Sequence, residues 1–329
     1  MSTSTSDLLT LKEGLFDNSH VTPAARANDA TDVHLPRGGQ IHTAAARPFR
    51  TAAIDHMQCG HLDCDDAERP RGANLGLYSL TFNNNLELDL HTLEKYKEFR
   101  EEAERKGFRH FMEVFDPNLP GVVPSELLGG FINDLIARTL AGVSQAGRPV
   151  FLKIVYHGPK AMEELVRYDP HLIVGVLGGA AGTTYDAFKL LGEAKKYGAR
   201  AALFGRKINQ AENQLAFIEF LRLIADDVLS PEEAVRAYHG VLQRLKVTPT
   251  RSLEDDMQLR TAVMSYGGST TVSVPVKVDS GQGIADSPKK TEAASKPAPV
   301  EKPKAPNFAT MSPAERLEYH RARLKKSLG

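Results

Sequence analysis

A regular alternation of apolar runs and amphipathic stretches between residues 77 and 204 constrains the fold most. The apolar runs predict strands, and the stretches between them have helical periodicity. We expect strands at Leu77–Phe82, Arg109–Phe115, Val150–Tyr156, Leu172–Leu177 and Ala201–Phe204, separated by helices at Leu90–Lys106, Ser125–Ala146, Lys160–Arg167 and Tyr185–Lys196. This β-α-β-α order predicts an α/β protein with a parallel sheet, either doubly wound or closed into a barrel.

The two ends of the chain differ in composition from its middle. Residues 1–45 are rich in small and polar side chains, which predicts a largely irregular N-terminal arm. Residues 279–310 alternate Pro, Lys, Ala and Ser, which is typical of a disordered linker. A helix start at Ser312 then predicts a short basic amphipathic helix within residues 311–329, which either packs on its own domain or docks on a protein partner. One domain, residues 46–278, remains, and it ends in helices over Leu215–Asp226 and Pro231–Leu245.

Charge and cysteine content narrow the class of protein. The 41 basic and 41 acidic side chains balance, which argues against a general nucleic-acid binder. No apolar run approaches the roughly 18 residues of a membrane span, and the N-terminus lacks the pattern of a secretory signal. Two cysteines, Cys59 and Cys64, are too few for a disulfide scaffold. We therefore expect a cytoplasmic protein with two unpaired thiols.

Lys153 is the one charged residue in the apolar run VFLKIVY. A lysine withdrawn from water inside a sheet favours the neutral amine, which is what a Schiff-base nucleophile requires. Alternatively, its side chain reaches the end of the strand or pairs with an acid such as Glu113 on the preceding strand. Spacing alone leaves both interpretations open.

Two glycine turns follow consecutive strands. Gly178 and Gly179 lie between a strand and a helix, and Gly205 with Arg206 repeats the arrangement one unit later. Such turns let backbone amides approach an anion, although glycines there also serve close packing. A pair of them after the last two strands is the geometry of the phosphate site of a TIM barrel.

Three motifs in the segment from residue 149 to residue 212 give a family resemblance. The segment resembles the last three strand units of class I aldolases of the archaeal-type fructose-bisphosphate aldolase superfamily, which also contains tagatose-bisphosphate aldolases. The matched positions, in chain order, are Lys153 with Tyr156, then Gly178 with Gly179, then Gly205 with Arg206 and the residues Ile208 to Gln210.

The resemblance implies a TIM-type (β/α) barrel and a metal-independent carbon-carbon lyase with no cofactor. Its substrate would be a phosphorylated ketose or related keto compound, which forms an imine with Lys153 while the glycine turns hold the phosphate. Thr51–His56 resembles the first family strand, which would place Asp55 near the imine. Some members carry a tyrosine before a proline where this chain has Asp116, so proton transfer would pass to Asp116, Glu113 or Tyr156.

The first half of such a barrel is too short in this chain. About twenty residues separate His56 from Leu77, and two strand-helix units do not fit there. The barrel is therefore abbreviated or irregular in its first half: either strands are missing, or the N-terminal arm or Thr270–Val278 fills their place, from this subunit or another. Exposed strand edges would favour association, so we expect a homo-oligomer.

Two other functions remain open. One is a catalytically silent barrel that binds a phosphorylated metabolite or a protein partner. The other is a zinc-dependent lyase that uses the cluster His56, Cys59, His61 and Cys64, because imidazole and thiolate are zinc ligands. The spacing of this cluster matches no standard C-x2-C pair, so we favour a polar loop without a metal.

Overall fold

The computed structural model describes residues 1–32, 37–179 and 182–261. Its main feature is a six-stranded parallel sheet in the order β1-β4-β5-β6-β7-β8. The strands are β1 (Ala25–Arg26), β4 (Leu75–Thr81), β5 (Arg109–Phe115), β6 (Leu152–Ile154), β7 (Val174–Gly178) and β8 (Ala201–Phe204). β2 (Asp29–Ala30) and β3 (Pro48–Phe49) form a separate antiparallel pair.

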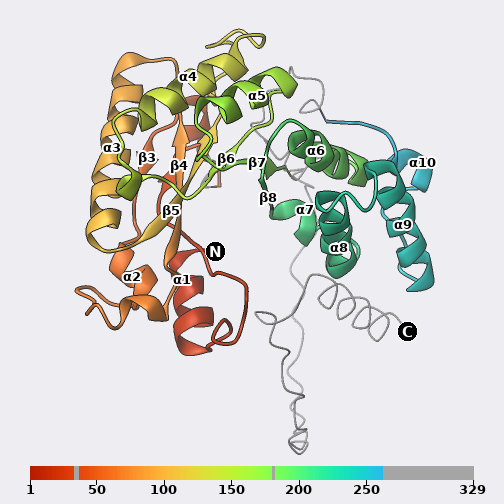
Figure 1. Ribbon diagram of the computed structural model, residues 1–329, viewed down its shortest axis with the longest axis horizontal. Helices are drawn as coiled ribbons and strands as arrows, with labels where there is room; N and C mark the ends of the chain where they lie inside the picture. The colour runs from red at the N-terminus through yellow and green to blue at the C-terminus, as the bar shows by residue number, and fades with distance from the viewer. Residues whose placement is uncertain (33–36, 180–181, 262–329) are drawn as a thin grey trace, which may run out of the picture. The chain divides into compact units, whose positions relative to one another are not determined.

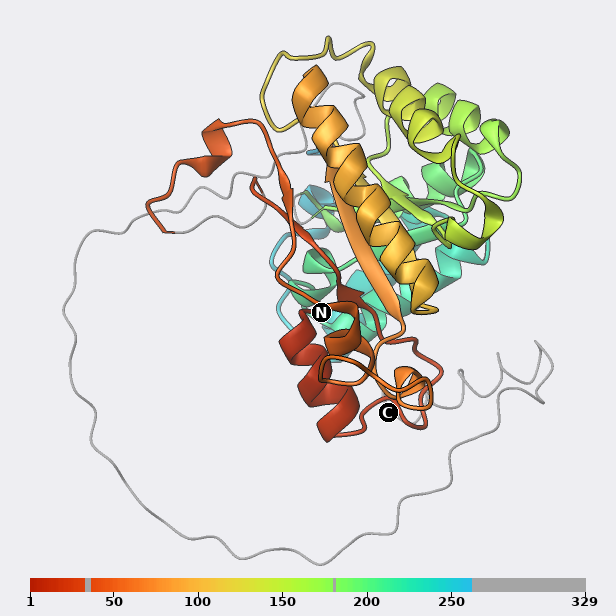
Figure 2. The same ribbon diagram turned by 90° about the vertical axis from the view of Figure 1, so that its left-hand side faces the viewer.

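Helices connect the strands of the sheet from β4 onward. They are α3 (Leu86–Arg105), α4 (Leu128–Leu140), α5 (Pro159–Tyr168) and α6 (Thr184–Lys196). The sequence sets where they begin: the Asn85 side chain accepts a hydrogen bond from the backbone N–H of Leu88, and Thr183 with Asp186 forms a capping box. In Figure 1 these four helices follow one another in chain order around the strands, and Figure 2 shows α3 lying along the sheet.

The two faces of the sheet differ because side chains alternate along each strand. Tyr78, Met112, Leu152 and Val174 belong to the core packed against the connecting helices. The residues between them in sequence, such as Ser79, Glu113 and Lys153, lie on the opposite face. A sheet whose strands follow chain order, with helices over one face, is the arrangement of a TIM-type (β/α) barrel. Within the described residues β1 and β8 each pair on one side only, so the barrel is open.

The N-terminal arm is more regular than expected. Thr3–Ser6 is α-helical (α1) and continues as a π-helix over Asp7–Lys12, and β1 pairs with β4 at the sheet edge. Of the explanations for the short first half, the structure therefore supports the one in which the arm supplies a strand.

The expectation that Thr51–His56 is a strand is wrong. Residues 51–53 have no regular structure, and Ile54–Gln58 is a short helix, α2. The buried side chains of Ile54 and Met57 are three residues apart, which is a helical spacing. Both views show α2 beside α1 (Figures 1 and 2).

A second apolar cluster packs α6 against the helices after β8. These are α7 (Arg206–Asn209), α8 (Gln214–Ala225), α9 (Pro231–Arg244) and α10 (Leu253–Asp256). Their core centres on Phe188, Phe217 and Tyr238. Short 3-10 helices occur at Ile41–Thr43, Arg69–Arg71 and Gln145–Gly147. Thr270–Val278, the linker at 279–310 and the basic helix at 311–329 lie outside the described residues. In the described part of the chain, no helix combines the length and apolar character that a membrane span needs.

Candidate functional site

A row of polar side chains crosses the sheet on the face away from the helices. Strand register places Ser79 opposite Glu113 and Glu113 opposite Lys153, on three neighbouring strands. Asn28, just after β1, extends the row: its amide donates to the carbonyl oxygen of Ser79 (2.8 Å) and accepts from the backbone N–H of Ser79 (2.6 Å). We refer to these four residues as the polar row.

Lys153 and Glu113 form an ion pair at the centre of the polar row. The ammonium contacts one carboxylate oxygen of Glu113, and the hydroxyl of Ser79 donates to the other at 2.8 Å. The side chain of Glu113 is 3% exposed and that of Lys153 is 17% exposed, so the carboxylate is buried while the lysine side chain is only partly buried. The pairing of Lys153 with Glu113 is one of the two interpretations that the sequence left open.

A second pair of ionisable groups lies where β5 and β6 end. Asp116 directly follows β5, and its Oδ1 is 2.8 Å from Nε2 of His157, which lies three residues beyond β6. Both side chains are mostly buried. Gly129 of α4 makes room for this pair, because a Cβ there would lie 2.9 Å from Cβ of His157. An aspartate that orients a histidine is a recurrent arrangement for moving protons.

His157 was not among the residues that sequence reasoning singled out. Its available signal was its position, since it directly follows an apolar strand and precedes the Gly158-Pro159 helix start. The carboxyl ends of parallel strands are where functional side chains gather in this class of fold.

The two glycine turns lie together, as the spacing predicts for adjacent parallel strands. The ammonium of Lys207, directly after Gly205 and Arg206, donates to the carbonyl oxygen of Gly182 at 2.8 Å and so links the two turns. Lys207 is buried, and this burial lowers the pKa of its ammonium. Arg206 is exposed beside it. A cationic group at paired strand-end turns is suited to an anion.

Gly178 has a packing role in addition. It pairs in register with Phe204, and a Cβ at Gly178 would collide with the Phe204 ring. Gly205 differs, since a Cβ there meets no atom within 4 Å among the described residues.

Asp55 does not lie beside Lys153. Its buried carboxylate accepts hydrogen bonds from Arg69 (2.8 Å) and from Lys106 (2.9 Å), which immediately follows α3 before β5 begins. Burial alone would raise the pKa of Asp55, but the bonds from Arg69 and Lys106 outweigh it and lower that pKa. Asp55 is therefore at the edge where the strands start, and the expectation that it acts near the imine is wrong.

Tyr156 is also separated from the polar row. It is 1% exposed and belongs to the core cluster that packs against the helices, whereas Lys153 lies on the opposite face. Of the five proposed catalytic residues, the structure thus brings together Lys153 with Glu113, and it places Asp116 at the adjacent strand end with His157.

The two cysteines are joined, which corrects the expectation of unpaired thiols. Cys59 and Cys64 form a disulfide, with Cα atoms 6.1 Å apart, in the loop that follows α2. Among the described residues the potential metal-ligating set at this loop is Cys59, His61 and Glu68, so His56 of the proposed cluster is not part of it.

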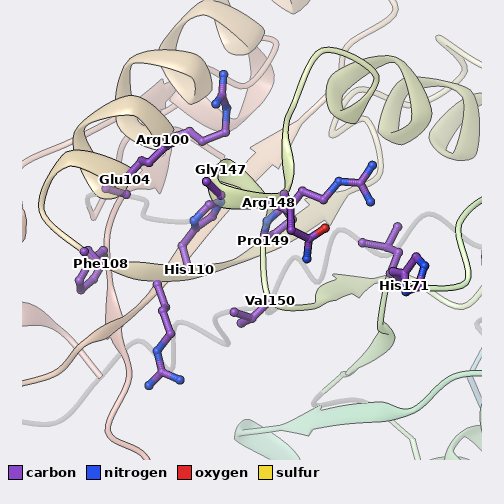
Figure 3. Close-up of a pocket in the computed structure, with 15 residues that line it drawn as sticks. Arg100, Glu104, Phe108, His110, Gly147, Arg148, Pro149, Val150 and His171 are labelled. Carbon is purple, nitrogen blue, oxygen red and sulfur yellow. The ribbon is translucent and has the colours of Figure 1, made fainter.

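A cavity of about 490 Å³ lies at the edge where β5, β6 and β7 begin. Figure 3 shows Arg100 and Glu104 of α3 beside it, with His110, Arg148 and His171 from the starts of the strands. Arg148 is paired with Asp169. Because this hollow is at the opposite edge from the Asp116–His157 pair, it is not the site that the sequence predicted.

One comparison with known proteins, that with solved structures, bears on the fold. No protein family profile matches the sequence, and no curated protein matches it. Among solved structures, the fructose-bisphosphate aldolase from Slackia heliotrinireducens DSM 20476 matches with a TM-score of 0.50 and 14% identity, covering 69% of this chain and 70% of that one. This likeness shows a shared TIM-type fold.

Two other solved structures match with lower TM-scores. A Schiff-base-forming fructose-1,6-bisphosphate aldolase is 17% identical with a TM-score of 0.46, and the match covers 67% of this chain and 76% of that one. An archaeal fructose 1,6-bisphosphate aldolase is 14% identical, also with a TM-score of 0.46, over 64% of this chain and 75% of that one.

Proposed function

We propose that this protein is a class I, Schiff-base aldolase that cleaves a phosphorylated ketose or a related keto compound without a metal. The observation that carries the proposal is the position of Lys153: a partly buried lysine at the centre of the polar row, on the sheet face away from the helices. The shared fold with an enzyme named as a fructose-bisphosphate aldolase supports the substrate class.

Lys153 supplies the nucleophile. Its neutral Nζ attacks the ketone carbon, a C–N bond forms, and loss of water gives the imine. Glu113, in contact with Nζ, accepts the proton that the ammonium must lose and returns a proton to the departing water. Ser79 holds the carboxylate of Glu113 in place through its hydrogen bond.

The Asp116–His157 pair accepts the proton of the substrate hydroxyl in the proposed reaction. When the carbon-carbon bond breaks, its electron pair moves into the imine to give an enamine, and the hydroxyl proton of the departing aldehyde passes to His157. Asp116 stabilises the resulting imidazolium across their 2.8 Å contact. Protonation of the enamine and hydrolysis of the imine then release the second product and restore Lys153.

The glycine turns are assigned the substrate phosphate. Backbone amides at Gly179 and Gly205, with the exposed guanidinium of Arg206, offer hydrogen-bond donors and a positive charge, and Lys207 adds a second cation. Binding there fixes the substrate relative to Lys153, which is an orientation effect.

Borohydride trapping tests the nucleophile directly. The protein is incubated with fructose 1,6-bisphosphate and other ketose and triose phosphates, reduced with borohydride, and digested for mass spectrometry. We expect one covalent adduct on the peptide that contains Lys153, lost in Lys153→Met and retained in Lys160→Met, an exposed lysine on α5. An adduct on another lysine, or none across the panel, would refute the proposal.

The ion pair itself favours a second function, a catalytically silent barrel that binds a phosphorylated metabolite. In that case the contact with Glu113 makes Lys153 a structural residue. Phosphate-ester binding that persists in Lys153→Met, combined with no turnover by the parent protein, would distinguish this function from the aldolase.

A further inference from the structure

The loop between α2 and β4 carries a group of metal-ligating side chains that the proposed reaction does not use. Sγ of Cys59, a ring nitrogen of His61 and a carboxylate oxygen of Glu68 all lie within 4.8 Å of one another. Cys64, the disulfide partner of Cys59, follows His61 by three residues in the same loop. Tetrahedral zinc with ligand bonds of 2.0–2.3 Å needs ligand atoms about 3.3–3.8 Å apart, so small side-chain movements suffice.

The orientation of His61 is that of a metal ligand. Its Nδ1 lies 2.8 Å from the carbonyl oxygen of Leu62, to which an Nδ1–H donates. Nε2 of the neutral ring then presents a lone pair to the Glu68 carboxylate, 3.3 Å away. Two acceptors facing each other need a cation between them, and a backbone-anchored imidazole is the usual form of a histidine ligand.

The disulfide decides whether the site can bind metal, because sulfur coordinates zinc as thiolate. A dithiol reductant converts the disulfide into two thiols and is itself oxidised to a disulfide. Zinc binding then displaces the two thiol protons.

We propose that Cys59, His61, Cys64 and Glu68 form a zinc site in the reduced protein, and that the Cys59–Cys64 disulfide replaces it in the oxidised protein. The two states close the same loop by different bonds. This zinc is structural, since the loop adjoins Asp55 at the edge where the strands begin, away from the Asp116–His157 pair.

Either the disulfide or the bound zinc would hold this loop in place and so stabilise its contacts with the rest of the protein. The backbone N–H of Asp63 donates to Asp55 at 3.1 Å, and Arg69 donates both to Asp55 and to the carbonyl oxygen of Cys64. Reduction without metal frees the loop that positions Arg69 against Asp55. We therefore expect the reduced, metal-free protein to melt at a lower temperature than both the oxidised and the reduced zinc-bound forms.

Zinc titration of the full chain tests the proposal without reference to activity. Protein reduced with a phosphine, and separately the oxidised protein, are titrated with Zn²⁺ against a chromophoric chelator. We expect one tightly bound zinc per reduced chain and at least a hundredfold weaker binding in the oxidised chain. In the reduced protein, His61→Asn and Glu68→Gln should each weaken binding about tenfold or more. His171→Asn, which changes an exposed histidine outside this loop, should have no effect.

Cobalt substitution provides a second readout, which reports directly on thiolate ligands of the metal. Co²⁺ in the reduced parent should show the sulfur-to-metal charge-transfer band of tetrahedral thiolate coordination, and Cys59→Ser should weaken it. Equal zinc affinity in the oxidised and reduced proteins, or a thiolate-cobalt spectrum unchanged in Cys59→Ser, would overturn the proposal.

Discussion

Replacing Lys153 by methionine should destabilise the protein through the charge left behind. Glu113 is 3% exposed, and within the described residues it would keep the hydrogen bond from Ser79 alone, so a buried carboxylate would lose its cation. Removing one partner of a buried ion pair costs about 3–5 kcal/mol, and the residual exposure of Lys153 points to the lower end, about 3 kcal/mol. This corresponds to a change of about a hundredfold in the folding equilibrium.

A double-mutant cycle separates this electrostatic effect from lost packing. Glu113→Gln retains an acceptor for Ser79 but removes the charge, so adding it to Lys153→Met should recover about 2 kcal/mol. The free energies of unfolding of the four proteins, measured by urea denaturation, give the coupling energy. The same cycle on the exposed pair Lys95–Glu98 serves as the control, with an expected coupling below about 0.5 kcal/mol. A coupling at Lys153–Glu113 no larger than that of the control would refute the reasoning.

Three further predictions concern stability, each measured by chemical denaturation. Burial lowers the pKa of His110 to about 4 from 6.5. The neutral His110 therefore contributes fully to the free energy of unfolding above pH 6.5, and up to about 3 kcal/mol is lost as the pH falls toward 4. His110→Gln should remove this slope, and an unchanged slope would assign it to another group. Asp55→Asn should cost about 2–3 kcal/mol at pH 7, because it leaves two partly buried cations without their carboxylate, and the difference from the parent should shrink as the pH falls through the lowered pKa of Asp55. Gly178→Ala should lower the free energy of unfolding by about 2 kcal/mol, because the new Cβ collides with Phe204. Gly205→Ala should lower it by less than about 1 kcal/mol. Equal losses would contradict the packing role of Gly178.

The part of the fold that the sequence predicts well is the part built from local periodicity. β5 at Arg109–Phe115 and β8 at Ala201–Phe204 agree with the predicted bounds, because each apolar run is closed by a helix or turn signal. β6 is shorter than its apolar run: Val150 precedes it and Tyr156 follows it. Beyond the ladder Val155 and Tyr156 remain buried, so the apolar run continues after pairing ends, whereas Val150 before the strand is exposed.

The N-terminal third was less predictable because non-local contacts decide it. β1 is only two residues long, too short for a periodic signal, and it exists because β4 pairs with it. Thr51–His56 resembled a strand of the aldolase family, yet the buried residues around Asp55 follow a helical spacing.

Within the candidate site, a charge inside an apolar run singled out Lys153, and the sequence offered Glu113 on the preceding strand as a possible partner, which is the contact that the structure shows. His157 had a weaker signal, since only the tertiary contact with Asp116 distinguishes it from an ordinary loop histidine. The Cys59–Cys64 pairing could not be deduced from two cysteines alone, because spacing does not reveal whether a loop brings them together.

The mutual hydrogen bonds between Asn28 and Ser79 join residues 51 positions apart in the chain. During synthesis the segment that becomes β1 leaves the ribosome before its partner strand exists, so its backbone groups stay solvated until β4 has been made. The strands from β4 to β8 have neighbours close in sequence and can pair as they emerge. The N-terminal strand β1 can pair only after β4 has been synthesised. The polar row is thus completed by a segment that is synthesised before β4 and that docks on a sheet edge made after it.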